Sequence, residues 1–254
     1  MSTSFAHLAA LGRAELTLLA RNKTNLFTVL FVPVLLTVAL KPALSMMDRA
    51  RAGSDVGPAL ISLSLGIVLV MAIYNTLTPV YATRRDELLL KRLRTGEVSD
   101  VVILIGAAVP MALTGLTQCV LLAVGISFLA DVAPPSAPHL AVLGMLLGVV
   151  VMVALAAATS AMAKTAESAQ VAIIPGMIVF LMGSGMLIPL DVLPEAVRTV
   201  CQWLPLTPVI ELIRAGWTGD ATAGESALNL LIAAIWTALS ILAVKRWFRW
   251  EPRS

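Results

Sequence analysis

Charged residues are scarce in this sequence, and cysteine and histidine are almost missing. Asp, Glu, Lys and Arg make up only 13% of the 254 residues, whereas 59% are hydrophobic and the mean hydropathy is +0.92. So little charge excludes an ordinary soluble domain and predicts an integral membrane protein. The two cysteines, Cys119 and Cys201, are too few for a framework of disulfide bonds, and we expect both to be packing residues.

The apolar residues are arranged in long stretches without any charge. A helix needs about 20 apolar residues to cross the roughly 30 Å hydrocarbon core of a bilayer, and six stretches approach or exceed this length. We therefore predict an all-α integral membrane fold with six transmembrane helices in a single domain, residues 1–254. The predicted spans lie near residues 25–45, 58–82, 102–128, 140–162, 169–188 and 226–245.

Several chemical functions lack the residues that they need. The sequence has no His-Glu-x-x-His, no Gly-x-Ser-x-Gly and no glycine-rich phosphate-binding loop, and its two histidines flank predicted spans. Its acidic residues lie at span ends or in loops, whereas an ion-driven carrier places ionisable groups inside the membrane. We therefore expect no catalytic residue, no metal site and no cofactor bound by this chain. If the protein uses ATP, another chain binds it.

The distribution of basic residues predicts the orientation of the chain. With both termini in the cytoplasm, 13 of the 18 Lys and Arg residues fall on the cytoplasmic side, in agreement with the positive-inside rule. This positive excess would lie beside anionic lipid head groups. We therefore expect the lipid bilayer as a partner, and no nucleic acid.

The segment before the first predicted span, residues 1–23, mixes polar and apolar residues. Phe5, Leu8, Leu16 and Leu19 recur at helical spacing, which predicts an amphipathic helix along the inner leaflet. The alternative is a helix that only leads into the first span.

A polar segment, TRRDELLLKRLRTGEVSD, separates the second and third predicted spans. We predict a short helix within residues 84–96, because acidic residues fall in its first turn, basic residues fall in its last turn, and Gly96 ends it. Its leucines form one apolar stripe, and its basic side chains, Arg85 among them, are left available to a partner. Two interpretations remain open: a solvated loop that only obeys the charge rule, or a cytoplasmic lever that a soluble partner binds.

Residues 190–217 do not fit a simple span. Pro194 suits the first turn of one amphipathic helix, and Pro205 and Pro208 separate it from a second short helix. Two such helices cannot cross a bilayer separately, so we predict a pair that enters the membrane from outside and returns. Glu211 and Arg214 should then lie in polar surroundings. The alternative is an external loop that packs on the bilayer.

Three smaller features also lead to expectations. Trp203 and Trp217 are expected at the level of the lipid head groups. The Gly144-x-x-x-Gly148 spacing predicts a close helix contact, with packing inside one chain favoured over a dimer seam. The Gly-Ser-Gly sequence at 183–185 marks either a hinge or simply the end of the fifth span.

Three stretches resemble ABC-2 type exporter permeases, and together they cover almost the whole chain. RRDELLLKRLRTGEVS resembles the intracellular coupling segment of that family. LLARNKTNLFTVLFVPVLL is similar to its entry into the first span, with Arg21 before the membrane and Pro33 inside it. SGMLIPLDVLPEAVRTVCQWLPLTPVIELIRAGWTG is similar to its signature of prolines followed by a late arginine, which are here Pro189, Pro194, Pro205 and Arg214.

The resemblance implies a permease subunit of an ATP-binding cassette (ABC) exporter in a bacterial inner membrane. It implies two permease copies, as a homodimer, each with a separate cytoplasmic ATPase that binds ATP and Mg²⁺. An amphipathic or lipid-linked substrate would leave outward between the two copies. The alternatives are an ATP-independent channel or carrier and a non-transporting membrane scaffold. The residues that would couple to the ATPase are Arg85, Asp86, Glu87, Leu88, Lys91, Arg92 and Leu93.

Overall fold

The second predicted span is one continuous helical rod. The computed structural model describes residues 56–86, 100–129, 132–188 and 190–247, together with Leu35 and Val38. In the rod, α3 (Val56–Val68) passes into a π-helix, η1 (Leu69–Asn75), and then into α4 (Thr76–Asp86).

Hydroxyl groups support the rod where its α-helical pattern is interrupted. Pro79 lies inside α4 and has no backbone N–H to donate. The hydroxyl of Thr76 donates to the carbonyl of Met71 at 2.9 Å, and the hydroxyl of Thr78 donates to the carbonyl of Tyr74 at 2.7 Å. These bonds give two carbonyl groups of the rod hydroxyl donors within the apolar bundle.

Four further helices are long and apolar enough to cross a membrane: α6 (Asp100–Leu129), α7 (Pro138–Met162), α8 (Ala166–Gly183) and α11 (Ala223–Trp247). With the rod, the described residues contain five candidate spans and no strand. The predicted all-helical membrane fold is therefore confirmed for this part of the chain. The first predicted span and residues 1–23 fall outside it, apart from the helical Leu35 and Val38, so the six-span arrangement stays a prediction.

The fifth span ends earlier than predicted. α8 stops at Gly183, the Ser184 hydroxyl donates to the carbonyl of Phe180, and Gly185 has a φ of 75°. A positive φ suits glycine and cannot continue an α-helix. The Gly-Ser-Gly sequence is therefore the end of the helix in this structure.

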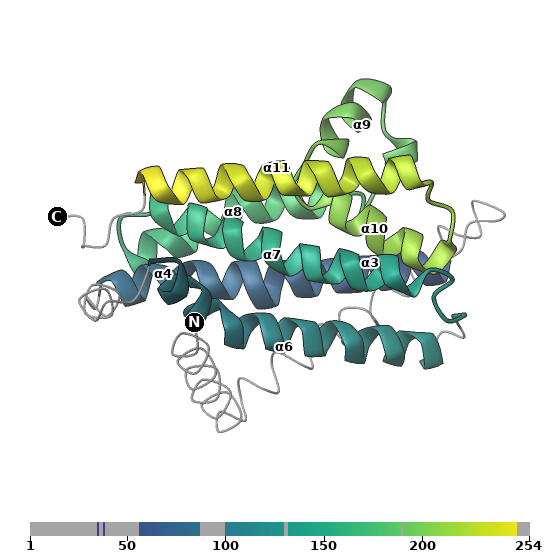
Figure 1. Cartoon of the computed structure of the whole chain (residues 1–254), viewed down its shortest axis with the longest axis horizontal. Helices are drawn as coiled ribbons and strands as arrows, with labels where there is room; N and C mark the ends of the chain where they lie inside the picture. The colour runs from purple at the N-terminus through teal and green to yellow at the C-terminus, as the bar shows by residue number, and fades with distance from the viewer. Residues whose placement is uncertain are drawn as a thin grey trace.

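The segment after α8 forms a 3₁₀ turn, η2 (Leu190–Val192), and two helices, α9 (Glu195–Gln202) and α10 (Thr207–Thr218). Figure 1 shows that α9 stands away from the bundle, whereas α10 lies inside it, in contact with α3, α7 and α11. The apolar positions of α10 are buried, and Gly219, with a φ of 78°, ends this helix.

Small residues let α7 approach α10 closely. A Cβ at Gly144 would lie 3.0 Å from the backbone nitrogen of Ile213, and one at Gly148 would lie 2.8 Å from a methyl group of Val209. The backbone nitrogen of Ala137 donates to the carbonyl of Gly216 at 2.9 Å. Both glycines of the Gly-x-x-x-Gly spacing therefore pack inside the chain, as expected.

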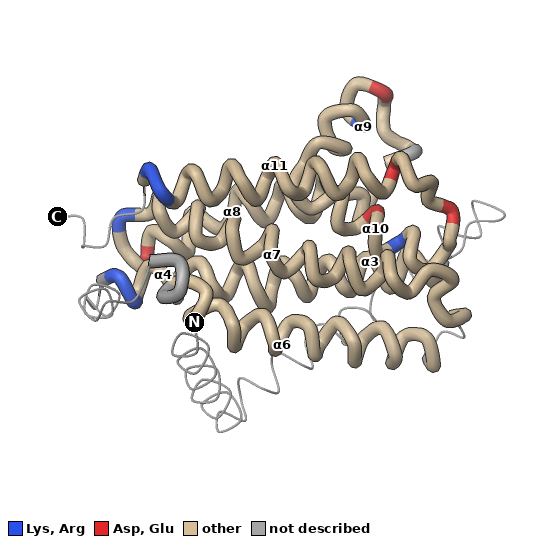
Figure 2. The backbone as a smooth tube through the Cα atoms, in the orientation of Figure 1, with Lys and Arg blue, Asp and Glu red and all other residues tan. Residues whose placement is uncertain are grey.

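Charged residues gather at the two ends of the bundle (Figure 2). At the end that we call the basic end, the last turns of α4 and α11 carry Arg84, Arg85, Lys245 and Arg246, and the passage from α7 to α8 carries Lys164 and Glu167. The opposite, acidic end contains Glu211, Asp220 and Glu225, together with Arg198 and Arg214, and Glu195 lies in the first turn of α9. These two ends contain the candidate functional sites.

Candidate functional site

Arg85, in the last turn of α4, is a fully buried arginine at the basic end. Its side chain is 0% exposed. One terminal nitrogen of the guanidinium group donates to the carbonyl of Ser160 at 3.2 Å, and the other donates to the carbonyl of Lys164 at 3.0 Å. Arg85 therefore connects the base of α4 to the end of α7 and the turn that follows.

The carbonyl groups that Arg85 binds are suited to a cation. The last carbonyls of a helix lack intrahelical donors and carry the negative end of the helix dipole. Ala82, Ala163 and Ala169 pack together beside this contact, so α4, the turn and α8 approach closely. The short apolar side chains leave room for the guanidinium group, and the carbonyls replace part of its lost hydration.

The turn after α7 is itself ordered by a reciprocal cap. The backbone nitrogen of Ser168 donates to the Thr165 hydroxyl at 3.1 Å, and the backbone nitrogen of Thr165 donates to the Ser168 hydroxyl at 2.8 Å. This capping box starts α8 immediately after Lys164. The cap therefore holds the neighbouring Lys164 carbonyl, which accepts a hydrogen bond from Arg85, in a defined position.

The predicted coupling helix requires a correction at its start. We expected a separate helix from residue 84 with Arg85 available to a partner, but Arg84, Arg85 and Asp86 are the last turn of α4, and Arg85 is buried. A run of charges usually indicates a solvated face, whereas the carbonyls of Ser160 in α7 and Lys164 in the following turn provide Arg85 with a site inside the protein. The remaining predicted coupling residues, Glu87, Leu88, Lys91, Arg92 and Leu93, lie outside the described residues, as do Arg21, Pro33 and Pro189.

The residues predicted in the segment 190–217, which forms α9 and α10, lie at the acidic end. Pro194 is the N-cap of α9, and Pro205 lies in the turn between α9 and α10. At the start of α10 the Thr207 hydroxyl donates to the carbonyl of Cys201 at 2.6 Å, which fixes the turn. The prolines thus separate two helices, as predicted.

Glu211 and Arg214 form an ion pair on α10. The guanidinium group of Arg214 donates to a carboxylate oxygen of Glu211 at 2.6 Å, and both side chains are partly exposed. Such a pair contributes little to stability, about 0 to 1 kcal/mol. Its more important effect is to hold both side chains in polar surroundings, as expected, at the wall of a cleft.

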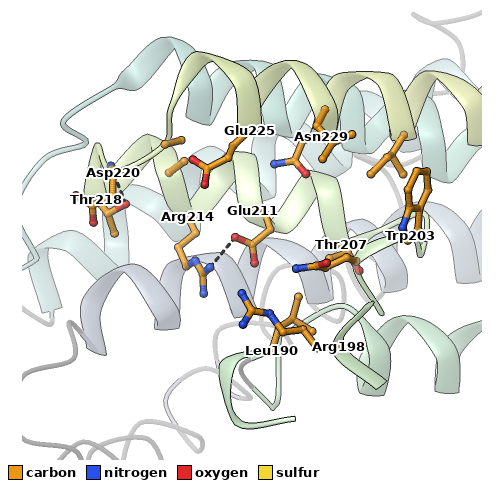
Figure 3. Close-up of a pocket in the computed structure, with 15 residues that line it drawn as sticks. Leu190, Arg198, Trp203, Thr207, Glu211, Arg214, Thr218, Asp220, Glu225 and Asn229 are labelled. Atoms are coloured by element: carbon orange, nitrogen blue, oxygen red, sulfur yellow. Dashed lines mark hydrogen bonds and ion pairs between the residues drawn. The ribbon is translucent and has the colours of Figure 1, made fainter. Parts of the chain in front are cut away.

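The cleft at the acidic end has a volume of about 450 Å³ and lies between α9, α10 and α11. Figure 3 shows Arg198 reaching from α9 toward Glu211 and Arg214, with Glu225 and Asn229 across the cleft on α11. Asp220 and Thr218 line one side, and Trp203 lines the other. We call this space the polar cleft. Acidic and basic side chains both line it.

The two tryptophans of this region differ. Trp203 is half-exposed, and its carbonyl accepts a hydrogen bond of 2.7 Å from the indole nitrogen of Trp236 on α11. Trp217, by contrast, is only 8% exposed, so protein and not lipid covers its ring, and its level relative to the head groups stays a prediction. The insertion of α10 explains the difference, because the start of α7 covers its last turn: the Ser136 nitrogen donates to the Trp217 carbonyl.

The fold and these two sites define a multi-pass helical membrane protein. The ABC-2 type transporter family matches residues 6–217, which is most of the chain, and the chain belongs to this family. It is therefore a transmembrane component of an ABC transporter, and it associates with a separate ATPase subunit that binds and hydrolyses ATP. No curated protein matches the sequence.

Proposed function

We propose that the chain is the permease of an ABC exporter in a bacterial inner membrane, and that it moves an amphipathic or lipid-linked substrate outward. The position of its ionisable residues carries this proposal. In the five described spans, every Asp, Glu, Lys and Arg lies in the first or last turn of its span. Because an ion-driven carrier needs such groups inside the membrane, we infer that transport energy comes from the ATPase.

The proposed assembly has two permease copies and two ATPase subunits. Each ATPase would contact the segment after α4, including Glu87, Leu88, Lys91, Arg92 and Leu93, and Arg85 would position its base. Exposed apolar side chains on α8 and α11 support the second copy, because only lipid or another helix can cover them in a membrane. These side chains include Val171, Ile174, Ile178, Leu231, Leu239 and Leu242.

Reconstitution in lipid vesicles tests the source of energy. We expect the purified chain alone neither to hydrolyse ATP nor to take up amphipathic dyes or labelled lipids along a proton gradient. With the ATPase and ATP, transport of at least one such probe should appear, and an ATPase variant that binds but cannot hydrolyse ATP is the control. Gradient-driven uptake by the chain alone would support a carrier instead.

The charge distribution also supports a proposed orientation with the basic end and both termini in the cytoplasm. Ser136, between α6 and α7, is exposed and lies at the opposite end from Lys164. In a background without Cys119 and Cys201, we expect Ser136→Cys to react with an impermeant thiol reagent in intact cells, and Glu97→Cys to react only after lysis. Labelling of residue 97 in intact cells would reverse this orientation.

A further inference from the structure

We propose that the polar cleft binds a phosphoethanolamine group, carried by a membrane lipid or by a soluble molecule. This proposal goes beyond the transport function and does not depend on its direction. It depends on four properties of the cleft: its volume, its depth along the bundle, its mixed charge and its apolar rim.

The cleft has the volume of a ligand site and lies near the membrane surface. Small-molecule sites commonly measure about 300 to 1,000 Å³, and this cleft measures about 450 Å³. Its polar residues on α11, Glu225 and Asn229, lie in the first two turns of that helix. At a rise of about 1.5 Å per residue, these side chains are within roughly 9 Å of the helix start. Trp203 and Trp236, joined by a hydrogen bond, also suit the boundary between head groups and hydrocarbon.

The charges that line the cleft favour a zwitterion. Three carboxylates, those of Glu211, Asp220 and Glu225, would repel a simple anion, and the guanidinium groups of Arg198 and Arg214 would repel a simple cation. The described residues contain no group of three or more His, Cys, Asp or Glu side chains that could hold a metal ion. A ligand with a positive and a negative group close together matches both sets of side chains.

The geometry of the ion pair assigns the two halves of the ligand. Glu211 holds Arg214 by one terminal nitrogen, and an arginine has five N–H donors, so further donors can reach a phosphate. Figure 3 shows the guanidinium groups of Arg198 and Arg214 close to Glu211. Glu225 lies beyond Arg214, toward α11. We therefore place the phosphate near Arg198 and Arg214, and the ammonium near Asp220 and Glu225.

A primary ammonium group fits better than a quaternary one, and a lipid is a natural carrier. The ammonium of phosphoethanolamine donates three hydrogen bonds to carboxylates, whereas the trimethylammonium of phosphocholine donates none. At the rim, Trp203 is 54% exposed and Leu228 is 49% exposed, and both line the cleft. These apolar surfaces can contact the glycerol and acyl chains of a lipid whose head group occupies the cleft.

Native mass spectrometry of the delipidated transporter complex tests this proposal. Phosphatidylethanolamine, phosphatidylcholine and phosphatidylglycerol with identical acyl chains are added in turn, and the bound copies are counted. We expect phosphatidylethanolamine to be retained at least about tenfold more strongly than either of the others, as the loss of a single hydrogen bond between charged groups implies. Equal retention of the three lipids, or a preference for phosphatidylglycerol, would overturn the proposal.

Variants at the rim connect this preference to the cleft. Arg198→Gln and Asp220→Asn alter exposed side chains of opposite charge, and Arg246→Gln at the basic end is the matched control. We expect both rim variants to lose the preference for phosphatidylethanolamine and the control to keep it; a preference that survives in both rim variants contradicts the assignment. Soluble glycerophosphoethanolamine identifies the carrier: displacement of the lipid shows that the head group suffices, and unchanged retention shows that the acyl chains are also required.

Discussion

The Arg85→Met variant is expected to be destabilised by about 3 kcal/mol, because removal of the guanidinium group leaves the buried carbonyl contact at Ser160 and the partly buried one at Lys164 without their charged donor. Methionine preserves most of the side-chain length, so the change removes the charged contacts with Ser160 and Lys164 and keeps much of the apolar packing. For a protein of this size, we expect the melting temperature of the purified protein to fall by roughly 10 °C.

Two further variants, one at Arg85 and one at the adjacent Arg84, serve as controls. Arg85→Lys keeps the charge but not the two-nitrogen fork, so we expect an intermediate melting temperature. Arg84→Met removes a charge from the adjacent, more exposed side chain and should change the melting temperature far less. Similar melting of Arg84→Met and Arg85→Met would show that the buried contact contributes no special stability. For the same reason, tests of ATPase binding should alter Arg92 or Leu88 and leave Arg85 intact.

The Gly216→Ala variant should disturb the contact between α7 and α10 even though it adds a single methyl group. That carbon would lie 2.5 Å from the backbone nitrogen of Ala141 and 2.7 Å from its Cα, so a backbone would have to move rather than a side chain. We expect a loss of at least about 2 kcal/mol and a lower melting temperature, since overpacking of a tight contact typically costs about 1 to 3 kcal/mol.

The same substitution at Gly125 provides the comparison. A Cβ at Gly125 in α6 would meet no atom within 4 Å. Alanine is favoured over glycine in a helix by about 1 kcal/mol, so Gly125→Ala should be neutral or slightly stabilising. If Gly216→Ala melts at the wild-type temperature, α10 is not held against α7 as tightly as this structure indicates.

Charge spacing predicted the described spans because the hydrocarbon core imposes a minimum length on any helix that crosses it. The separation of α9 from α10 was also predictable, since Pro205 and Pro208 cannot occupy a helix interior without disrupting it. Both features depend on local sequence. The apolar residues Val209, Leu212 and Ile213 recur at helical spacing in the sequence, and in α10 they are buried.

The buried arginine and the buried tryptophan could not be predicted in this way. Arg85 binds the carbonyl of Ser160, 75 positions away, and a sequence pattern does not reveal which distant carbonyls lie beside a charge. Trp217 is covered because α10 enters the bundle so deeply, which depends on contacts with α7. The π-helix has no simple sequence signature, because its i to i+5 bonding differs from an α-helix only in the position of the acceptor. The Thr165–Ser168 cap does have a local signal, in the hydroxyl residues at positions 165 and 168.

The π-helix within the second span changes the direction in which its two halves face. A wider turn of this kind is equivalent to one extra residue in an α-helix, which rotates the following residues by about 100° relative to those before it. Accordingly, α3 contacts α6 and α10, whereas α4 contacts mainly α7 and α8, with a smaller contact to α6. Without that rotation, a straight helix would present the same stripe along its whole length, and Arg85 would point away from the end of α7. One widened turn near the middle of the bundle thus determines where a charged group is buried several turns away.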